Sequence, residues 1–237
     1  MSESGSFSLT TFSPSGKLVQ IEHALAAVSA GATSLGIRAS NGVVIAAEKK
    51  IPSPLLDDSS IEKLIRISST VGMVYSGMAP DVRVLVNAGR KAAIAYEQQF
   101  GEQMPTRLVA RRLAEVMQEY TQSGGVRPFG VSLLVAGFDD SGPQLFQVDP
   151  SGAFWAWKAT AIGKSHLNGK TFLEKRYNAE MELQDAIFTV LLALKEIYDG
   201  PVTCRNIELG VVQVVDGKPQ FSKFSPTQLA EYLAQIE

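Results

Sequence analysis

Cysteine and histidine are scarce in this sequence of 237 residues. It contains one cysteine, Cys204, and two histidines, His23 and His166. A single cysteine cannot form an internal disulfide bond, and low cysteine usage is typical of a reducing compartment. Neither histidine belongs to a spaced pair with a second soft ligand, so the sequence predicts no metal site. Two segments that end like phosphate loops lack the leading glycine that such loops need, so we expect no cofactor either.

Charge is also sparse. Charged residues make up 19% of the chain, and the net charge is −2. Nucleic-acid-binding proteins normally carry a basic stripe, so this composition argues against a nucleic-acid partner. No apolar run is long enough to cross a bilayer, and the first eight residues show no basic-then-apolar leader. We therefore expect a protein of the cytoplasm and nucleus that binds neither nucleic acid nor membrane.

Apolar residues, at 45%, are by contrast plentiful. Their spacing predicts groups of strands that alternate with pairs of helices. A first helix is predicted at 15–30, capped by Ser15, and an Asn41-Gly42 turn with positive φ at both residues is predicted to join the first two strands. Further helices are predicted near 81–100, 105–120, 169–177, 185–198 and 226–236, and further strands near 71–75, 130–138, 144–149, 153–159, 207–215 and 220–224.

The strand pattern predicts the fold class. Hairpins and a meander make the sheets antiparallel, yet the runs at 43–47 and 131–135 contain apolar residues on both faces. A strand that is buried on both faces must be covered on each of them. We therefore predict an α+β fold in a single domain spanning 1–237. It comprises a mobile tail at 1–12, an extra N-terminal helix at 15–30 and a four-layer α/β/β/α sandwich of two antiparallel sheets at 33–237.

The start of the first strand carries the main chemical signal. It reads Gly31-Ala32-Thr33-Ser34-Leu35-Gly36-Ile37. A Gly-Thr-Thr-x-x-Gly-Ile run at such a place is where an N-terminal-nucleophile hydrolase is cut, which exposes a threonine with an attacking hydroxyl and an activating amine. Here Ala32 stands at the nucleophile position. Glu48 and Lys63 stand where an acid and a lysine would tune that nucleophile, although this spacing alone is more typical of surface residues.

Two longer motifs resemble a known family. Residues 7–22 read FSLTTFSPSGKLVQIE, and residues 120–132 read YTQSGGVRPFGVS. The first is similar to the N-terminal signature of eukaryotic 20S proteasome alpha subunits, and the second is similar to the central motif of the same family. The segments KATAIG at 158–163 and FLEKRY at 172–177 continue the resemblance over nearly the whole chain.

The resemblance implies the N-terminal-nucleophile hydrolase fold without a catalytic threonine, and thus no catalytic residues and no proteolysis by this chain. It implies other alpha subunits in a seven-membered ring, adjoining beta subunits that hold the proteolytic sites, and a regulatory particle or other activators that dock through C-terminal tails. The expected role is that of a structural and gating subunit of the core particle, which controls substrate entry in ubiquitin-dependent protein degradation.

The resemblance also implies a pocket for activator tails. Lys63, Leu18 and Gly31 match positions of the family that line this pocket. Lys63 matches the lysine that meets the terminal carboxylate of the activator. A charge-assisted bond of this kind contributes about 1.5–3 kcal/mol.

A second set of positions matches the turn at the gate. Phe12, Pro14 and His23 belong to it, and the fixed φ of the proline sets the angle at which the tail leaves. His23 stands where the family usually has a tyrosine, and Gly5 and Ser6 precede Phe7 where another tyrosine is common. Both tyrosines belong to the cluster that holds the gate open. We therefore expect this tail to contribute to closure instead.

Two other functions are compatible with the residues. The first is an N-terminal-nucleophile threonine peptidase matured by autocleavage, which would lose its first 31 residues and against which Ala32 argues. The second is a free-standing binding module, which would behave as a monomer of 25.5 kDa.

Overall fold

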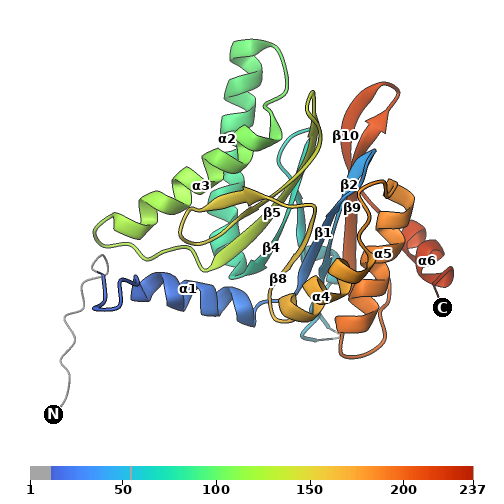
Figure 1. Ribbon diagram of the computed structural model, residues 1–237, viewed down its shortest axis with the longest axis horizontal. Helices are drawn as coiled ribbons and strands as arrows, with labels where there is room; N and C mark the ends of the chain where they lie inside the picture. The colour runs from blue at the N-terminus through green and yellow to red at the C-terminus, as the bar shows by residue number, and fades with distance from the viewer. Residues whose placement is uncertain (1–11, 54, 237) are drawn as a thin grey trace.

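Two antiparallel sheets lie face to face at the centre of the computed structural model, which describes residues 12–53 and 55–236 (Figure 1). Each sheet has five strands. Sheet A has the order β10-β9-β2-β1-β8, and sheet B has the order β3-β4-β5-β6-β7. The strands are β1 (Ser34–Arg38), β2 (Gly42–Glu48), β3 (Leu64–Arg66), β4 (Val71–Gly77), β5 (Val131–Asp139), β6 (Gly142–Val148), β7 (Phe154–Ala156), β8 (Ala159–Ile162), β9 (Ile207–Val215) and β10 (Lys218–Lys223).

Helices cover the outer face of each sheet and one end of the sandwich (Figure 1). α2 and α3 pack on sheet B, α4, α5 and α6 pack on sheet A, and α1 contacts β4 and β5 at the end. The helices are α1 (Val19–Ala30), α2 (Ala79–Phe100), α3 (Thr106–Gln122), α4 (His166–Arg176), α5 (Leu183–Ile197), α6 (Pro226–Ala234) and the short 3-10 helix η1 (Asp58–Ser60). The predicted four-layer sandwich with an extra N-terminal helix is confirmed.

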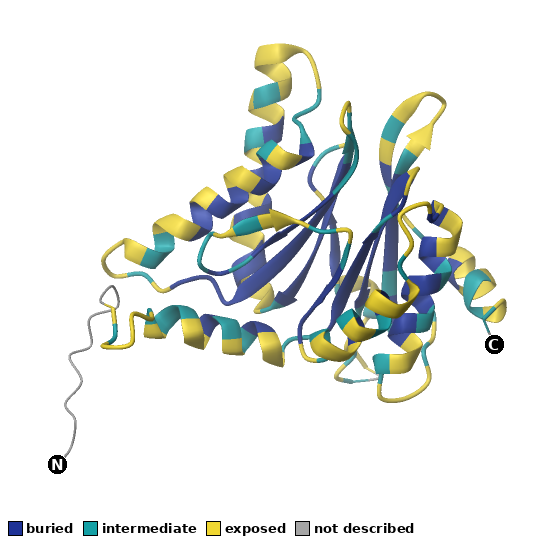
Figure 2. Ribbon diagram, viewed as in Figure 1, coloured by how far each residue is buried: buried dark blue, intermediate teal, exposed yellow. Residues whose placement is uncertain are grey.

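Buried residues form three apolar layers, one between the sheets and one beneath each group of helices. In Figure 2 the ribbon of the central strands is mostly buried, whereas the helices alternate between buried and exposed stretches. Strand β2 contributes to two of the layers. Val43 and Ile45 point into the layer between the sheets, whereas Val44 and Ala46 point into the layer beneath α5. Because fully burying one aliphatic side chain contributes about 1.5–3 kcal/mol, such two-faced strands hold the layers together. The apolar runs on both strand faces are thus explained.

The start of the N-terminal helix differs from the prediction. Ser15 does not cap it, because α1 begins at Val19 and its N-cap residue makes no side-chain bond. The backbone amide of Lys17 instead donates to Oγ of Ser13 at 3.1 Å. Gly16 has a φ of +76°, which interrupts a helical path. A closed turn therefore precedes α1.

The predicted turn between the first two strands is also wrong in its conformation. Neither Asn41 nor Gly42 has a positive φ. Oδ1 of Asn41 accepts a hydrogen bond of 2.7 Å from the amide of Leu183, so a tertiary contact shapes this connection. The last hairpin behaves as its sequence predicts, with φ values of 51° at Asp216 and 75° at Gly217.

The predicted strand at 153–159 is in fact two strands in different sheets. β7 pairs with β6 in sheet B, and β8 pairs with β1 in sheet A. The chain crosses between the sheets at Trp157 and Lys158. The amide of Trp157 donates to the carbonyl of Leu145 at 2.8 Å, and the amide of Arg38 donates to the carbonyl of Lys158 at 2.8 Å. These bonds hold the crossing at the edge of the sandwich. The short strand β3 was not predicted.

The central motif forms a clamp between helix α2 and strand β5. The guanidinium of Arg127 donates to both carboxylate oxygens of Asp81, at 2.6 and 2.9 Å, and the amide of Gly130 donates to one of them at 2.9 Å. Asp81 lies in the first turn of α2, and Gly130 precedes β5. Hydrogen bonding from Arg127 lowers the pKa of Asp81. The motif therefore fixes the start of α2 to the start of β5.

We expect Asp81→Asn to lower the free energy of unfolding of the purified chain by about 1–2 kcal/mol at pH 7, a discounted value because the Arg127 side chain is 55% exposed. A depressed carboxyl pKa contributes stability above the unfolded pKa of about 4 and loses it as pH falls through the folded pKa. The difference between the two proteins should therefore shrink in acid. Urea unfolding at several pH values measures it.

Glu115→Gln is the matched control, because Glu115 pairs with Arg111 and Arg112 on an exposed face of α3. This control should change stability by less than about 0.5 kcal/mol. A loss at Asp81 no larger than that of the control, or one that does not depend on pH, would contradict the clamp.

Candidate functional site

Strands β1 and β2 bring the Ala32 segment beside Glu48. The amide of Thr33 donates to Oε2 of Glu48 at 3.2 Å, and the amide of Glu48 donates to the carbonyl of Thr33 at 2.9 Å. From the other sheet, Oγ of Ser76 donates to the carbonyl of Ala32 at 2.8 Å. Thr33 and Ser76 are fully buried. The nucleophile position is thus anchored to both sheets.

The backbone carbonyl groups on either side of this position are also held in place. The carbonyl of Gly31 accepts a hydrogen bond of 2.9 Å from the amide of Lys164. Gly163 has a φ of +96°, and a Cβ atom there would lie 2.6 Å from the carbonyl oxygen of Ala32. The nitrogen of Ala32 belongs to a peptide bond, and its side chain is a methyl group. This site has neither the hydroxyl nor the free amine that peptide hydrolysis by an N-terminal threonine requires.

α1 seats on the end of the sandwich through a contact that only glycine permits. A Cβ atom on Gly31 would lie 2.3 Å from the nitrogen and 2.9 Å from the Cα of Gly77. Further along the helix, a Cβ atom on Gly130 would lie 3.6 Å from the Cβ of Ala27. The end of α1 therefore lies directly on the ends of β4 and β5. The helix covers this end of the sheets, as Figure 1 shows.

Lys63 is a buried cation beside this end. It is 7% exposed, and its Nζ lies 3.7 Å from the centre of the Tyr75 ring. Burial lowers the pKa of Lys63 to about 8, an effect that the negative charges of Glu208 and Glu48 partly offset. In the described part of the chain, no carboxylate oxygen lies within 4.0 Å of Nζ. Lys63 thus carries a charge that no ion pair neutralises.

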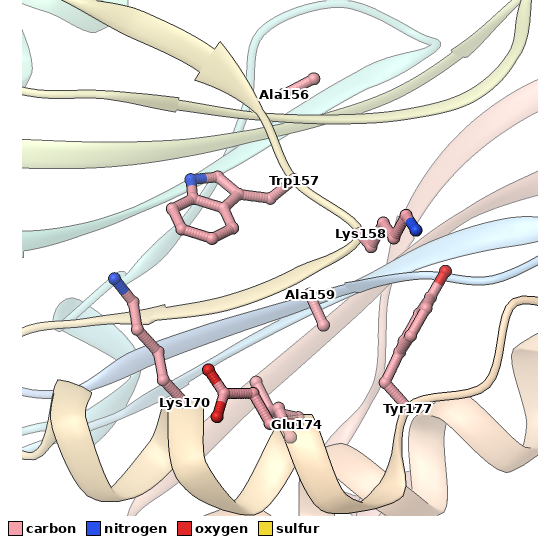
Figure 3. Close-up of a pocket in the computed structure, with 8 residues that line it drawn as sticks. Ala156, Trp157, Lys158, Ala159, Lys170, Glu174 and Tyr177 are labelled. Carbon is pink, nitrogen blue, oxygen red and sulfur yellow. The ribbon is translucent and has the colours of Figure 1, made fainter.

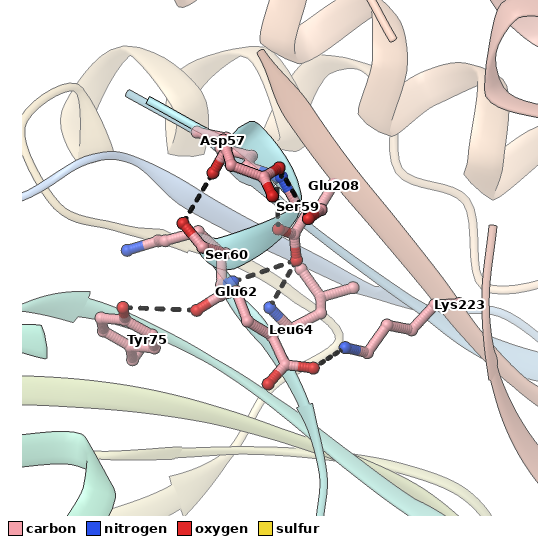
Figure 4. Close-up of polar contacts among 10 residues, drawn as sticks. Asp57, Ser59, Ser60, Glu62, Leu64, Tyr75, Glu208 and Lys223 are labelled. Carbon is pink, nitrogen blue, oxygen red and sulfur yellow. Dashed lines mark hydrogen bonds and ion pairs between the residues drawn. The ribbon is translucent and has the colours of Figure 1, made fainter. Parts of the chain in front are cut away.

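Glu208 organises the backbone that carries Lys63, and the sequence did not indicate it. Oε2 of Glu208 accepts hydrogen bonds from the amides of Lys63 and Leu64, at 3.0 and 2.9 Å (Figure 4). Oε1 lies 3.5 Å from Nζ of Lys49. The one available signal was a glutamate inside the otherwise apolar start of β9, directly after Ile207.

A hollow of about 370 Å³ opens beside Glu208. Its lining includes Lys49 and the ion pair between Glu62 and Lys223 (Figure 4). The hydroxyl of Tyr75 donates to the carbonyl of Glu62 at 3.5 Å. Charged groups of both signs therefore surround the segment that carries Lys63.

The three predicted pocket residues are not adjacent in one chain. Lys63 approaches β4 at Tyr75, and Gly31 approaches the same strand at Gly77. Leu18 precedes α1, and a helix of twelve residues spans about 18 Å, so Leu18 lies about that far from Gly31. The structure brings Lys63 and Gly31 to one strand and places Leu18 a helix length away.

The predicted gate residues lie at the outer end of α1. Phe12 is 72% exposed, and Pro14 and His23 are exposed as well. The turn that contains Pro14 closes with bonds of 2.8 Å from the amide of Ser13 to the carbonyl of Lys17 and from the amide of Gly16 to the carbonyl of Ser13. The predicted mobile tail, apart from Phe12, lies outside the described residues.

A second hollow, of about 420 Å³, lies where the chain crosses between the sheets (Figure 3). Trp157, Lys170 and Tyr177 line it, and Nζ of Lys170 lies 4.8 Å from the centre of the Trp157 ring. Trp157 also packs against the layer between the sheets. Its ring serves packing, and no hydrogen bond or ion pair joins the described polar side chains that line this hollow to one another.

Residues 12–53 and 55–236 contain neither a candidate membrane span nor a candidate metal site. None of their helices combines the length and the apolar character that a membrane span requires. Their histidine, cysteine, aspartate and glutamate side chains form no group of three that would hold a metal ion.

Two family models match the sequence. The model for proteasome subunits in general matches residues 28–212, and the model for the N-terminal signature of A-type proteasome subunits matches residues 6–27. The boundary between them falls near the end of α1, the helix that covers the sandwich.

The chain is also similar to curated proteins over nearly its whole length. It is 57% identical to the alpha type-2 proteasome subunit of Oryza sativa subsp. indica over 232 residues, which are 98% of this chain and 97% of that protein. The alpha type-2-A proteasome subunit of Arabidopsis thaliana is 58% identical with the same coverage. The probable alpha type-2 proteasome subunit of Schizosaccharomyces pombe is 56% identical over 100% of both chains.

Ala32→Thr is expected to restore the hydroxyl without restoring hydrolysis, because the nitrogen of residue 32 stays in a peptide bond beneath α1. Intact mass and N-terminal sequencing of the purified variant should show the full chain, and peptide hydrolysis should stay at background. A new terminus at residue 32 would show that the threonine alone suffices for cleavage. Ala32→Val, which adds similar bulk without a hydroxyl, is the matched control.

Proposed function

Since the chain belongs to the proteasome alpha subunits, a non-catalytic class that assembles with other proteasome subunits, we propose that it docks activator tails and helps to close the entrance of the core particle. The shared fold and the alkyl side chain at position 32 agree with a subunit that shapes the particle without cutting peptides. The proposed partners are other alpha subunits in a ring of seven, beta subunits, and a regulatory particle or other activators. The proposed location is the cytoplasm and nucleus.

The observation that carries the docking proposal is the buried ammonium of Lys63. It faces the Tyr75 ring and has no carboxylate within ion-pair distance in the described residues. Burying an unpaired charge is costly, so a carboxylate that enters the site gains a charge-assisted bond and relieves that cost. A C-terminal tail ends in such a carboxylate. Because Leu18 lies a helix length away, we place it in a pocket completed by the neighbouring subunit.

The gating proposal rests on the turn before α1. Eleven residues precede Phe12, and a fully extended chain of that length spans at most about 36–40 Å. Pro14 and the two backbone bonds of the turn fix the direction in which the chain leaves the helix. A ligand that favours one position of this turn over another would shift the tail between closed and open states.

Lys63→Ala should weaken the binding of a peptide with a free C-terminal carboxylate by about 10- to 150-fold at this site, because a charge-assisted bond worth about 1.5–3 kcal/mol is lost. The peptide carries a photoreactive residue next to its C-terminus and is added to reconstituted core particles. Mass spectrometry then counts crosslinks to this chain alone.

Lys91→Ala is the control for that experiment, because it removes an exposed lysine of α2 that is not among the charges acting on Lys63. The C-terminal amide of the same peptide is the second control. Equal labelling of the Lys63→Ala and unmodified particles, or equal labelling by acid and amide, would refute the docking proposal.

Deleting residues 2–11 should raise peptide hydrolysis by the latent core particle, because one of the segments that block the entrance is gone. Peptide hydrolysis is measured without activator, in particles that differ only in this chain. Replacing residues 2–11 by a glycine-serine segment of equal length separates the effect of sequence from that of length. Unchanged hydrolysis in the deletion variant would exclude a contribution of this tail to closure.

A further inference from the structure

Glu208 holds an unusual position relative to Lys63. One of its carboxylate oxygens accepts hydrogen bonds from the amides of Lys63 and Leu64, at 3.0 and 2.9 Å. The other lies 3.5 Å from Nζ of Lys49, which is itself buried. Both oxygens are therefore committed, and neither lies within 4.0 Å of Nζ of Lys63. Glu208 is near enough to act on the ammonium through its charge, while its contacts go to the two amides and to Lys49.

Glu208 holds the backbone at the start of β3 in place. β9 and β3 belong to different sheets, and the two hydrogen bonds of Glu208 tie β9 to Leu64, the first residue of β3, and to Lys63 just before it. Hydrogen bonds to a charged group are stronger than those between neutral groups. They fix the point from which the side chain of Lys63 runs over the Tyr75 ring.

Glu208 also acts on the charge of Lys63. Glu208 and Glu48 favour the ammonium, while burial and the cation of Lys50 oppose it. Around Tyr75, the charges that act on the pKa of its hydroxyl are Glu208 of β9, Arg83 of α2 and Glu62 before β3. Among the carboxylates, Glu208 has the largest effect on the pKa of Lys63.

We infer that Glu208 is a positioning residue of the activator pocket: it fixes the backbone beneath Lys63 and keeps the ammonium charged while leaving it free to bind a carboxylate from outside. This inference rests on the proposed docking function. It gives sheet A, through Glu208, a role in binding the carboxylate. The pocket residues Lys63, Leu18 and Gly31 do not include any residue of that sheet.

The test measures carboxylate binding against pH in reconstituted core particles. The photoreactive peptide with a free carboxylate and its amide are the probes, and crosslinks to this chain are counted between about pH 6.5 and 9.5, a range that brackets the titration of Lys63. In the unmodified particle, labelling that depends on the carboxylate should fall as pH rises through about 8, where the pKa of Lys63 lies. Glu208→Gln should move that midpoint down by about 0.5–1 pH unit, which makes binding about three- to tenfold weaker above it.

Lys50→Gln is the matched control, because it removes one charge of the opposite sign from an exposed position. Its midpoint should move up, since the cation of Lys50 lowers the pKa of Lys63. Opposite shifts of the two variants support the inference, because a merely structural role of Glu208 would lower labelling without moving the midpoint.

A midpoint that stays in place in Glu208→Gln, in a particle that labels normally, overturns the role of Glu208 and leaves the docking function intact. If acid and amide label the unmodified particle equally, the docking function is wrong and this inference falls with it. Glu208→Asp keeps the charge but shortens the reach to the two amides. It should lower labelling several-fold at every pH with the midpoint in place, and unchanged labelling in this variant would overturn the backbone part of the inference even if Glu208→Gln does not assemble.

Discussion

The close approach of Gly31 to Gly77 is the contact on which the rest of the site depends. No side chain fits between these two backbones, since a Cβ atom on Gly31 would lie 2.3 Å from the nitrogen of Gly77. The contact seats α1 on the end of sheet B and keeps the partly buried bond before Ala32 at the junction of α1 and β1. A catalytic relative of this architecture needs a free amine at that place. The same contact therefore favours a covered, inactive sandwich.

Lys63 is the charged group on which the docking proposal depends. Its ammonium is buried beside an aromatic ring, with carboxylates near it but none in contact in the described residues. Such an arrangement costs stability unless an anion enters. Glu208 limits that cost through the field of its charge and directs its hydrogen bonds to the backbone. In the proposed function, this site activates no nucleophile, but the positive charge of Lys63 binds the carboxylate of an activator tail.

Much of the fold could be predicted from local sequence, because local physics determines it. The apolar residues on both faces of β2 require a layer on each side, and the helix predicted near 226–236 begins at a capping box formed by Ser225 and Gln228. Long-range contacts determine the features that were missed. The residues around Trp157 look like one strand, but pairing with β1 draws the second half into the other sheet. Glu208 lies 145 positions from Lys63, and no pattern links them.

The central claim is that this chain belongs to a protease without being one of its catalytic chains. Intact-mass analysis of this chain, taken from a core particle that hydrolyses peptides, tests it most directly. The account predicts a chain that is uncut between Gly31 and Ala32, with the full mass of 25.5 kDa apart from terminal trimming. A chain that begins at Ala32 in the active particle would contradict it.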